Sequence, residues 1–497
     1  MIKRLLIIAI LLVAVLIAVP CWGAFDINTT DCNDDDATTW CIQTTETTVT
    51  DADCGGTCSG GDTLYIEGGA RGDLYFNGLD GGGSYITIKN DPTDRVVITE
   101  TDTAGNGVLS FHDCKYIDVR GDNNVSFTYG IKAIGAVVGG DTVPTTGVVW
   151  VYGESDHVKL SYIEVDYGEG VTGTASSGIK VQDTTLSADW TFDTFEIHHN
   201  YVHDTTYSGL YTGHNCAKND CQDECYPYNG NIQSCPYTAN FNIHDNLFED
   251  LGSYGLTLKG VEAGTGVNYI TDNTIRRAGL TTTKGGEFEI GIGVSYFYGT
   301  TYAIISGNRT ENTGGPGIYA REAPHIIYDN TILGAGTTDD VDGHWTHGLV
   351  ISQWDTMTGE TRDDIIQIYD NVIIQPVTYG IYSPQTEAQG LMARNIIAES
   401  GSDEWHNLES PGLVEGEDTS DCSAAWGSGP PSPTDCANVY DADTDNICFT
   451  TWSDDTDYSN DDFTLCCAYA YTSVGANLCG AAATPWSGVS CQGCVMN

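Results

Sequence analysis

One pattern of apolar and polar positions recurs along the chain from Phe195 onward. An apolar residue, two mostly polar residues and an Asn are followed by apolar residues, and then by a Gly that opens a short apolar alternation. The spacing between successive Asn residues varies from 22 to 46 residues, which is typical of a solenoid with loops of unequal length. The repeats read IHHNYV, IHDNLF, ITDNTI, ISGNRT, IYDNTI, IYDNVI and MARNII, with Asn200, Asn246, Asn273, Asn308, Asn330, Asn371 and Asn395.

The Gly-led segments predict short strands. GLYTG, GLTLK, GIGVS, GIYAR, GLVIS and GIYSP alternate with a period of two, which argues against helices. A β-sandwich or propeller also has short strands, but an Asn recurring once per coil favours a parallel β-helix. We expect the Asn to adopt the left-handed conformation at a corner and to stack into a ladder. The sequence therefore predicts an all-β chain, a single-stranded right-handed parallel β-helix of about ten to twelve coils.

The ends of the chain differ from the repeat. Residues 1–23 combine a basic start with an apolar run of 15 residues, which predicts a secretory signal peptide and, after its removal, no transmembrane span. Residues 24–61 and 401–497 are rich in Cys, and we expect an N-terminal cap and a C-terminal segment that cover a β-helix spanning 62–400.

The cysteines of an exported chain are expected in disulfides. Four of them fall in one insertion at 214–238, which predicts a disulfide-closed loop, with a zinc site that includes His214 as the alternative. Cys114 stands apart from every cluster and is the candidate for a buried free thiol.

The charge limits the partners. The chain has 69 Asp and Glu against 19 Lys and Arg, a formal net charge of −50, which argues against nucleic acid as a partner. The carboxylates leave calcium open as a cofactor, although the DADTDN run at 441–446 lacks the Gly and the terminal Glu of a calcium loop.

Two further stretches carry a family resemblance. GDTLYIEGGARGDLYFNG with SYITIKNDPTDRVVIT, and the tail DDFTLCCAYAYTSVGANL, resemble the opening and closing segments of pectate-lyase-like β-helix proteins. The resemblance covers residues 61–478 and implies the fold more specifically than the function, since lyases, polygalacturonases, esterases, epimerases and surface proteins share it. The polygalacturonase motifs are incomplete, with only Thr346-His347-Gly348 close, and the Asp-Pro-His-Asp of epimerases is absent.

Basic residues are scarce, so their clustering is informative. Lys259, Arg276, Arg277, Lys284, Arg309 and Arg321 fall within about 65 residues. Aligning the alternations puts Lys259, Ser295, Arg321 and Ser352 in one outward column and Tyr211, Tyr319 and Tyr382 in the other. Lys259 and Arg321 would then lie two coils, roughly 10 Å, apart.

This arrangement predicts a site for an acidic glycan. β-Elimination of a uronate needs a cation for the carboxylate, a base and an acid. The stretch Gly255–Lys259 followed by VNYITDNTIRR resembles a segment of chondroitin- and alginate-type lyases, which implies Lys259 as the base and an assisting Arg about one coil onward. Arg321 fits the role of carboxylate partner. His214, at the same strand end one coil earlier, could be acid or base near neutral pH. Sugar rings would stack on the tyrosines. The full substrate-binding set comprises Tyr211, Tyr319, Tyr382, Arg276 and Arg277.

Other interpretations remain open. Lys259 and Arg321 could instead pair with Glu262 and Glu322 on a solvated face. Hydrolysis would need two flanking carboxyl groups, for which acids are too frequent here to be diagnostic. His198 and His244, at equivalent corners, are expected to be stacked structural groups. The sequence thus predicts a secreted β-helix that acts on polysaccharide or a cell-surface glycan, as a lyase or as a non-catalytic binding solenoid.

Overall fold

The structure is a computed structural model. It describes residues 39–54, 58–101, 107–123, 126–135, 147–167, 177–183, 190–213, 236–262, 266–279, 289–297, 301–321, 324–337, 346–352, 365–383, 389–393 and 395–398, and six short strands beyond them. The predicted signal peptide, most of the predicted loop at 214–238 and the candidate His214 lie outside the described residues. Within these described ranges, no helix has the length and apolar character needed to cross a membrane.

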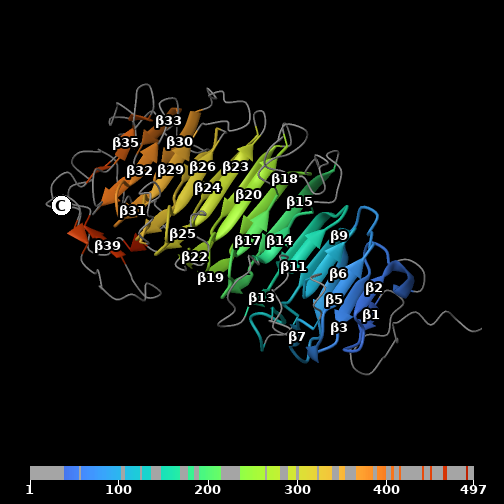
Figure 1. Ribbon diagram of the computed structural model, residues 1–497. Helices are drawn as coiled ribbons and strands as arrows, with labels where there is room; N and C mark the ends of the chain where they lie inside the picture. Colours follow the sequence, from blue (N-terminus) through green and yellow to red (C-terminus); the bar gives the residue numbers. More distant parts are fainter. Residues whose placement is uncertain are drawn as a thin grey trace, which may run out of the picture.

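Parallel strands stack into three rows that run the length of the molecule (Figure 1). Row one is β1 (Thr39–Ile42), β3 (Thr63–Ile66), β6 (Ile86–Asn90), β9 (Lys115–Arg120), β12 (Asp156–Ser161), β15 (Thr191–His198), β18 (Tyr237–His244), β21 (Val267–Thr271), β24 (Tyr302–Ser306), β27 (Ile326–Tyr328), β30 (Ile365–Tyr369), β33 (Gln389–Ala393) and β36 (Leu413–Glu415).

Row two is β2 (Thr48–Thr50), β5 (Leu74–Asn77), β8 (Leu109–His112), β11 (Gly147–Tyr152), β14 (Ser177–Val181), β17 (Leu210–Thr212), β20 (Leu256–Val261), β23 (Ile292–Phe297), β26 (Ile318–Arg321), β29 (Leu349–Ser352), β32 (Ile381–Ser383) and β35 (Trp405–Asn407). Row three is β4 (Gly69–Arg71), β7 (Val96–Thr99), β10 (Ile131–Ile134), β13 (Ile163–Asp166), β16 (Tyr201–His203), β19 (Leu247–Leu251), β22 (Thr274–Ala278), β25 (Arg309–Glu311), β28 (Thr331–Leu333), β31 (Val372–Ile374), β34 (Ile396–Ala398) and β37 (Val439–Tyr440).

Each coil contributes one strand to each row, so strands β3 to β35 fill eleven complete coils, within the predicted range. The chain is the predicted right-handed parallel β-helix. A 3-10 turn (η1, Asp51–Cys54) and three short strands, β38 (Cys448–Phe449), β39 (Phe463–Cys466) and β40 (Val489–Ser490), stand apart from the rows.

The core lies inside the coils because the period-two pattern turns alternate side chains inward. Equivalent inward residues stack from coil to coil, as Phe76 does on Phe111 with ring centroids 5.1 Å apart, and Phe195 on Phe241 at 4.9 Å. Each such buried side chain contributes about 1.5–3 kcal/mol. Stacking is therefore what gives a single coil its stability. One inward column of row two contains Phe76, Phe111, Val151, Val181, Thr212, Leu258, Val294, Ala320 and Ile351.

All seven predicted Asn residues form one ladder at the corner between rows one and three. The amide nitrogens of the first six donate to the amide oxygen of the next Asn at 2.9–3.0 Å. All seven also donate to a backbone carbonyl of the preceding coil at 2.8–3.0 Å. The side chains are at most 2% exposed, so the predicted ladder is confirmed.

The conformational role predicted for the Asn is wrong. The left-handed residue at this corner is the one before the Asn, as with His199, Asp245 and Asp329, each with φ close to 54°. Gly307 takes the same place at φ 66°. The Asn is selected by its side chain, because its amide satisfies buried donors and acceptors of two coils at once.

The stacked rows extend beyond the predicted boundaries of the β-helix. β1 and β2 pair in register with β3 and β5, so the rows begin inside the segment 24–61. β36 and β37 continue them past residue 400. The segment that precedes residue 62 thus contributes the first partial coil.

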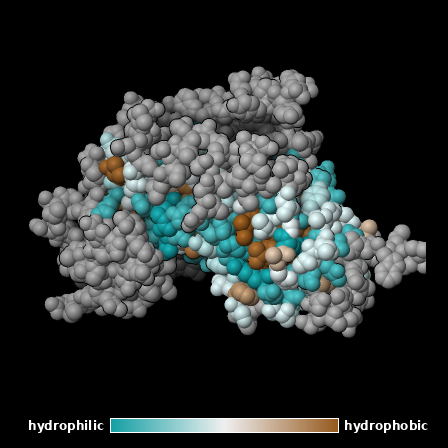
Figure 2. All heavy atoms as spheres, turned by 60° about the horizontal axis from the view of Figure 1, so that its bottom comes forward, coloured by the Kyte–Doolittle hydropathy of each residue, from teal (hydrophilic) through white to brown (hydrophobic). Residues whose placement is uncertain are grey.

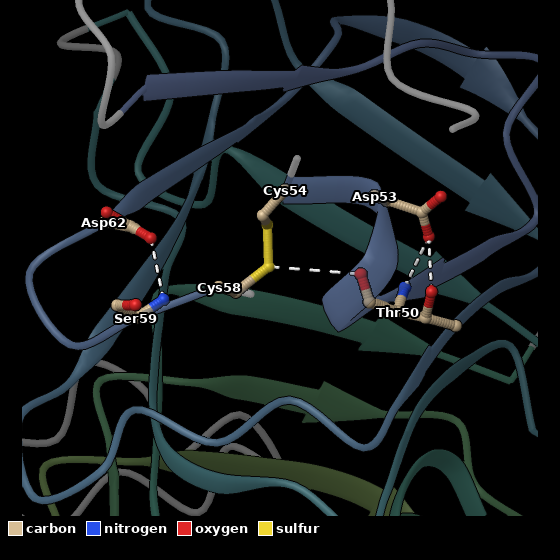
Figure 3. Close-up of a disulfide and its surroundings, with 6 residues drawn as sticks. All are labelled: Thr50, Asp53, Cys54, Cys58, Ser59 and Asp62. Atoms are coloured by element: carbon tan, nitrogen blue, oxygen red, sulfur yellow. Dashed lines mark hydrogen bonds between the residues drawn. A yellow bond between two sulfur atoms is a disulfide. The ribbon is translucent and has the colours of Figure 1, made fainter. Parts of the chain in front are cut away.

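A short disulfide closes the N-terminal region. Figure 3 shows Cys54 at the end of η1 bonded to Cys58, while the Asp53 carboxylate accepts hydrogen bonds from the backbone amide and hydroxyl of Thr50. Cys41 is also in a disulfide. Cys114 is the free cysteine of the described residues and is fully buried, as predicted.

Candidate functional site

Two outward columns run along row two, and the strand register confirms the predicted alignment. Lys259 pairs with Ser295, and Arg321 pairs with Ser352. The other column joins the three predicted tyrosines and extends to earlier coils. Its members from the N-terminal end are Tyr75, Ser110, Trp150, Lys180, Tyr211, Thr257, Gly293, Tyr319, Val350 and Tyr382.

Lys259 lies between two aromatic rings. Its Nζ is 4.8 Å from the ring centre of Tyr254 and 5.0 Å from that of Tyr211, and the residue is only 7% exposed. Tyrosine faces attract an ammonium group, and more strongly where water is scarce. Glu262, the carboxylate considered as its partner, accepts a hydrogen bond from the Thr191 hydroxyl at 2.7 Å. The structure therefore brings two of the predicted residues, Lys259 and Tyr211, into contact.

Lys180 is a site residue that the sequence reasoning missed. It pairs with Tyr211 from the preceding coil, so lysines of two coils lie on either side of this tyrosine. Burial lowers the pKa of Lys180 to about 8, and Asp183 opposes this effect. The segment GIKV from Gly178 is a Gly-led alternation that could have revealed it. The coil that contains this segment lacks the corner Asn that marks the later repeats.

An aromatic belt continues from this point along the outer side of row two. Tyr254, Ile290, Tyr319 and Val350 form a buried cluster outside the sheet, against which Tyr207 and Tyr382 pack. This belt leads from the two lysines to Arg321.

Arg321 lies at the far part of the belt. Its guanidinium is 5.9 Å from the ring centre of Tyr319. One coil further, the His347 ring lies 4.0 Å from that of Tyr382, and Tyr379 stacks on Tyr382 at 5.6 Å. Tyr382 lies two coils beyond Tyr319 in the same column, and both Tyr382 and Tyr379 are partly exposed.

Arg276 and Arg277 are not brought to this face. Both lie on β22 in row three, where Arg276 bonds the buried carboxylate of Glu311 at 3.0 Å. Arg277 pairs with Glu249 and Asp250, each at 2.7 Å. Both guanidinium groups are paired with carboxylates of row three, so they do not join the site around Lys259.

The outer surface of row three is charged and hydrophilic. Figure 2, turned so that the lower side of Figure 1 comes forward, shows mostly hydrophilic described residues with hydrophobic residues at a few separate places. Glu164, Asp166 and His203 lie close enough here to hold a metal ion. The ammonium of Lys132 already bonds Glu164 and Asp166 at 2.6 and 2.8 Å. These carboxylates therefore have a cation of their own.

Corner histidines form the second group of potential metal ligands among the described residues, His198, His199 and His244. The predicted stacking is confirmed, since the rings of His198 and His244 are parallel within 3° and 4.9 Å apart. This group lies between rows one and three and not on row two.

Several solved structures have a similar arrangement at low sequence identity. An alginate lyase from Paenibacillus sp. is 12% identical, with 76% of this chain and 97% of that chain covered and a TM-score of 0.33. A lacto-N-biosidase from Eubacterium ramulus is 11% identical, with 72% and 61% covered and a TM-score of 0.48. A mannuronan C-5 epimerase module from Azotobacter vinelandii is 14% identical, with 71% and 91% covered and a TM-score of 0.36. No protein-family model matches the chain, and no curated protein sequence matches it significantly.

Proposed function

We propose that this protein is a secreted enzyme that binds a uronate-containing polysaccharide along the outer side of row two and cleaves it by β-elimination. The observation that carries the proposal is the gathering of Lys180, Lys259 and Arg321 with tyrosine rings on one side of a chain whose net charge is −50. An acidic glycan is repelled by most of such a surface. A local group of cations gives it one favourable place to bind.

The aromatic rings supply the second element of binding. Tyr211, Tyr379 and Tyr382 are partly exposed, and a sugar ring stacks on such faces through its apolar side. Hydroxyl and carboxylate groups of the glycan would then point toward the cations. This geometry suits a chain of uronate residues better than a neutral glycan.

The environments of the two lysines suggest different roles. Elimination requires a neutral amine to remove the proton next to the carboxylate, and the lowered pKa of Lys180, about 8, makes its neutral form accessible. Lys259 lies between two tyrosine faces that attract a cation, and it is placed to neutralise the carboxylate. We therefore assign the base to Lys180 in place of Lys259. Lys180 removes the proton next to the carboxylate, the C–H electrons form the double bond as the glycosidic C–O bond breaks, and water or the newly formed Lys180 ammonium protonates the departing oxygen. Lys259 and Arg321 act on the carboxylates of the glycan.

The test is absorbance of the unsaturated product on alginate, pectate and chondroitin, with and without calcium. We expect activity on at least one of them, rising with pH through an apparent pKa near 8. Lys180→Arg keeps the charge but removes the base, so kcat should fall about 10²–10⁴-fold with little change in KM. Lys259→Ala and Arg321→Ala should raise KM as well as lower kcat.

Lys89→Ala is the matched control, because Lys89 is a partly exposed outward lysine of row one. It should leave activity unchanged. Absence of unsaturated product on every uronate tested would exclude the lyase. Retained glycan binding in that case, lost in Lys259→Ala, would support the binding solenoid instead.

A further inference from the structure

Three histidines meet at one corner of two consecutive coils. His198 ends β15 and pairs in register with His244, which ends β18. His199 follows His198 in the left-handed conformation, φ 54°, and the next coil has Asp245 in the equivalent place, also φ 54°. The segments IHHN and IHDN therefore place three imidazoles and one carboxylate next to one another on the surface of two adjacent coils.

The ring nitrogens of these histidines face one another. The Nδ1 atoms of His198 and His199 are 2.9 Å apart, with the two rings nearly perpendicular at 87°. One nitrogen of each of the three rings lies within 4.8 Å of the others. All three residues are partly exposed, so an ion from solvent has access to the group.

We propose that His198, His199 and His244 bind a divalent ion of the zinc type that ties the two coils together. Tetrahedral zinc with metal–nitrogen distances of about 2.0–2.1 Å separates its nitrogen ligands by about 3.3 Å. The two Nδ1 atoms are already close to that separation, and small ring rotations bring in His244. Three imidazoles leave one position for water, and imidazole is the ligand that selects zinc, copper, nickel or cobalt over calcium.

Carboxylates next to the cluster orient its rings. Asp245 lies 2.8 Å from Nδ1 of His244, and Glu196 lies 3.4 Å from Nε2 of the same ring. The Asp245 contact fixes the tautomer of His244, raises its basicity and leaves Nε2 as the nitrogen that binds the ion, with Glu196 close to it. Glu196 is also paired with Lys159 at 2.6 Å, so the negative charge beside the cluster is moderated.

The backbone under the cluster is held in place before any ion binds. Asn200 and Asn246 follow His199 and Asp245 directly, and their amides bond one another at 3.0 Å in the ladder. His199 also stacks on Tyr162 of the preceding coil at 4.9 Å. An ion would therefore find its ligands largely preorganised, which reduces the ordering cost of binding.

The contrast with the cluster of row three supports the assignment. There the Lys132 ammonium fills the space between Glu164 and Asp166, whereas the three histidines contact one another, the Asp245 carboxylate and the Tyr162 ring. A positive ion is what the histidine corner accommodates.

The experiment is titration of the EDTA-treated full chain with Co²⁺, followed by visible absorption, and displacement of the Co²⁺ by Zn²⁺. We expect one binding event with nitrogen-ligand d–d bands that is lost, or weakened at least about ten-fold, in each of His198→Ala, His199→Ala and His244→Ala. Zinc should also raise the Tm of the wild type and not that of the variants.

His157→Ala is the matched control. His157 has φ 52° and stacks on Tyr116 at 4.3 Å, as His199 does on Tyr162, but it belongs to neither of the potential metal-binding groups. The control should bind Co²⁺ like the wild type. Equal binding by the wild type and all three ligand variants, or no saturable binding by the wild type, would overturn the proposal.

Discussion

Replacing Asn308 with Ala removes one rung from the middle of the amide ladder. The Asn308 amide nitrogen donates to the carbonyls of Ile270 and Ser306 and to the amide oxygen of Asn330, at 2.8, 3.1 and 3.0 Å. Its oxygen accepts from both the backbone and the side-chain nitrogen of Asn273, each at 3.0 Å. The variant loses all five hydrogen bonds within a site that is 1% exposed.

The magnitude follows from the groups left without partners. The backbone N–H of Asn273 and the carbonyl of Ile270 each lose a partner, and a buried polar group without one costs about 1–3 kcal/mol. Asn273 retains two carbonyl acceptors for its amide, so its side chain adds little. We expect Asn308→Ala to lower the free energy of unfolding by about 2–5 kcal/mol.

Hydrogen exchange and urea unfolding measure this effect together. Peptides covering 267–278 and 302–312 should lose amide protection, because the damage is shared by adjacent coils of a solenoid. Asn242→Ala is the control, since Asn242 is a partly exposed outward residue of β18. It should change stability by at most about 0.5 kcal/mol. A similarly small change for Asn308→Ala would refute the view that the ladder stabilises the corner.

Two further predictions concern titratable groups, one half-buried and one fully buried. Burial, with Asp370 and Asp272 nearby, raises the pKa of Asp329 to about 7 from 3.8, so its contribution to stability is lost as pH rises through 7. Asp329→Asn should therefore have a free energy of unfolding about 1–3 kcal/mol above that of the wild type at pH 8 but not at pH 4, as measured by urea titration. A difference in stability that does not change with pH would contradict this. Burial raises the pKa of Cys114 to about 12, so this thiol should react with a thiol reagent only in denaturant, and rapid labelling of the native chain, mapped by mass spectrometry, would count against it.

Two features were predictable because they depend on local periodicity. A period of two decides which side chains share a face, and a repeated corner residue aligns the coils, so the Asn ladder and the tyrosine column followed from the sequence. The register of Lys259 with Ser295 followed in the same way. The early coils were harder to align from the sequence, because they lack the corner Asn. Lys180 was therefore indicated only by one Gly-led alternation.

The sequence by itself determined the solenoid, its inward and outward columns and the isolated buried thiol. The tertiary structure decided what each side chain meets, because contacts between coils depend on the corner conformation and on loops of unequal length. It placed the left-handed turn one residue before the Asn, held Lys259 between Tyr211 and Tyr254, and directed Arg276 to Glu311 in another row. It also joined His199 to histidines of two coils, since residues 45 positions apart in the chain become neighbours only when the coils stack.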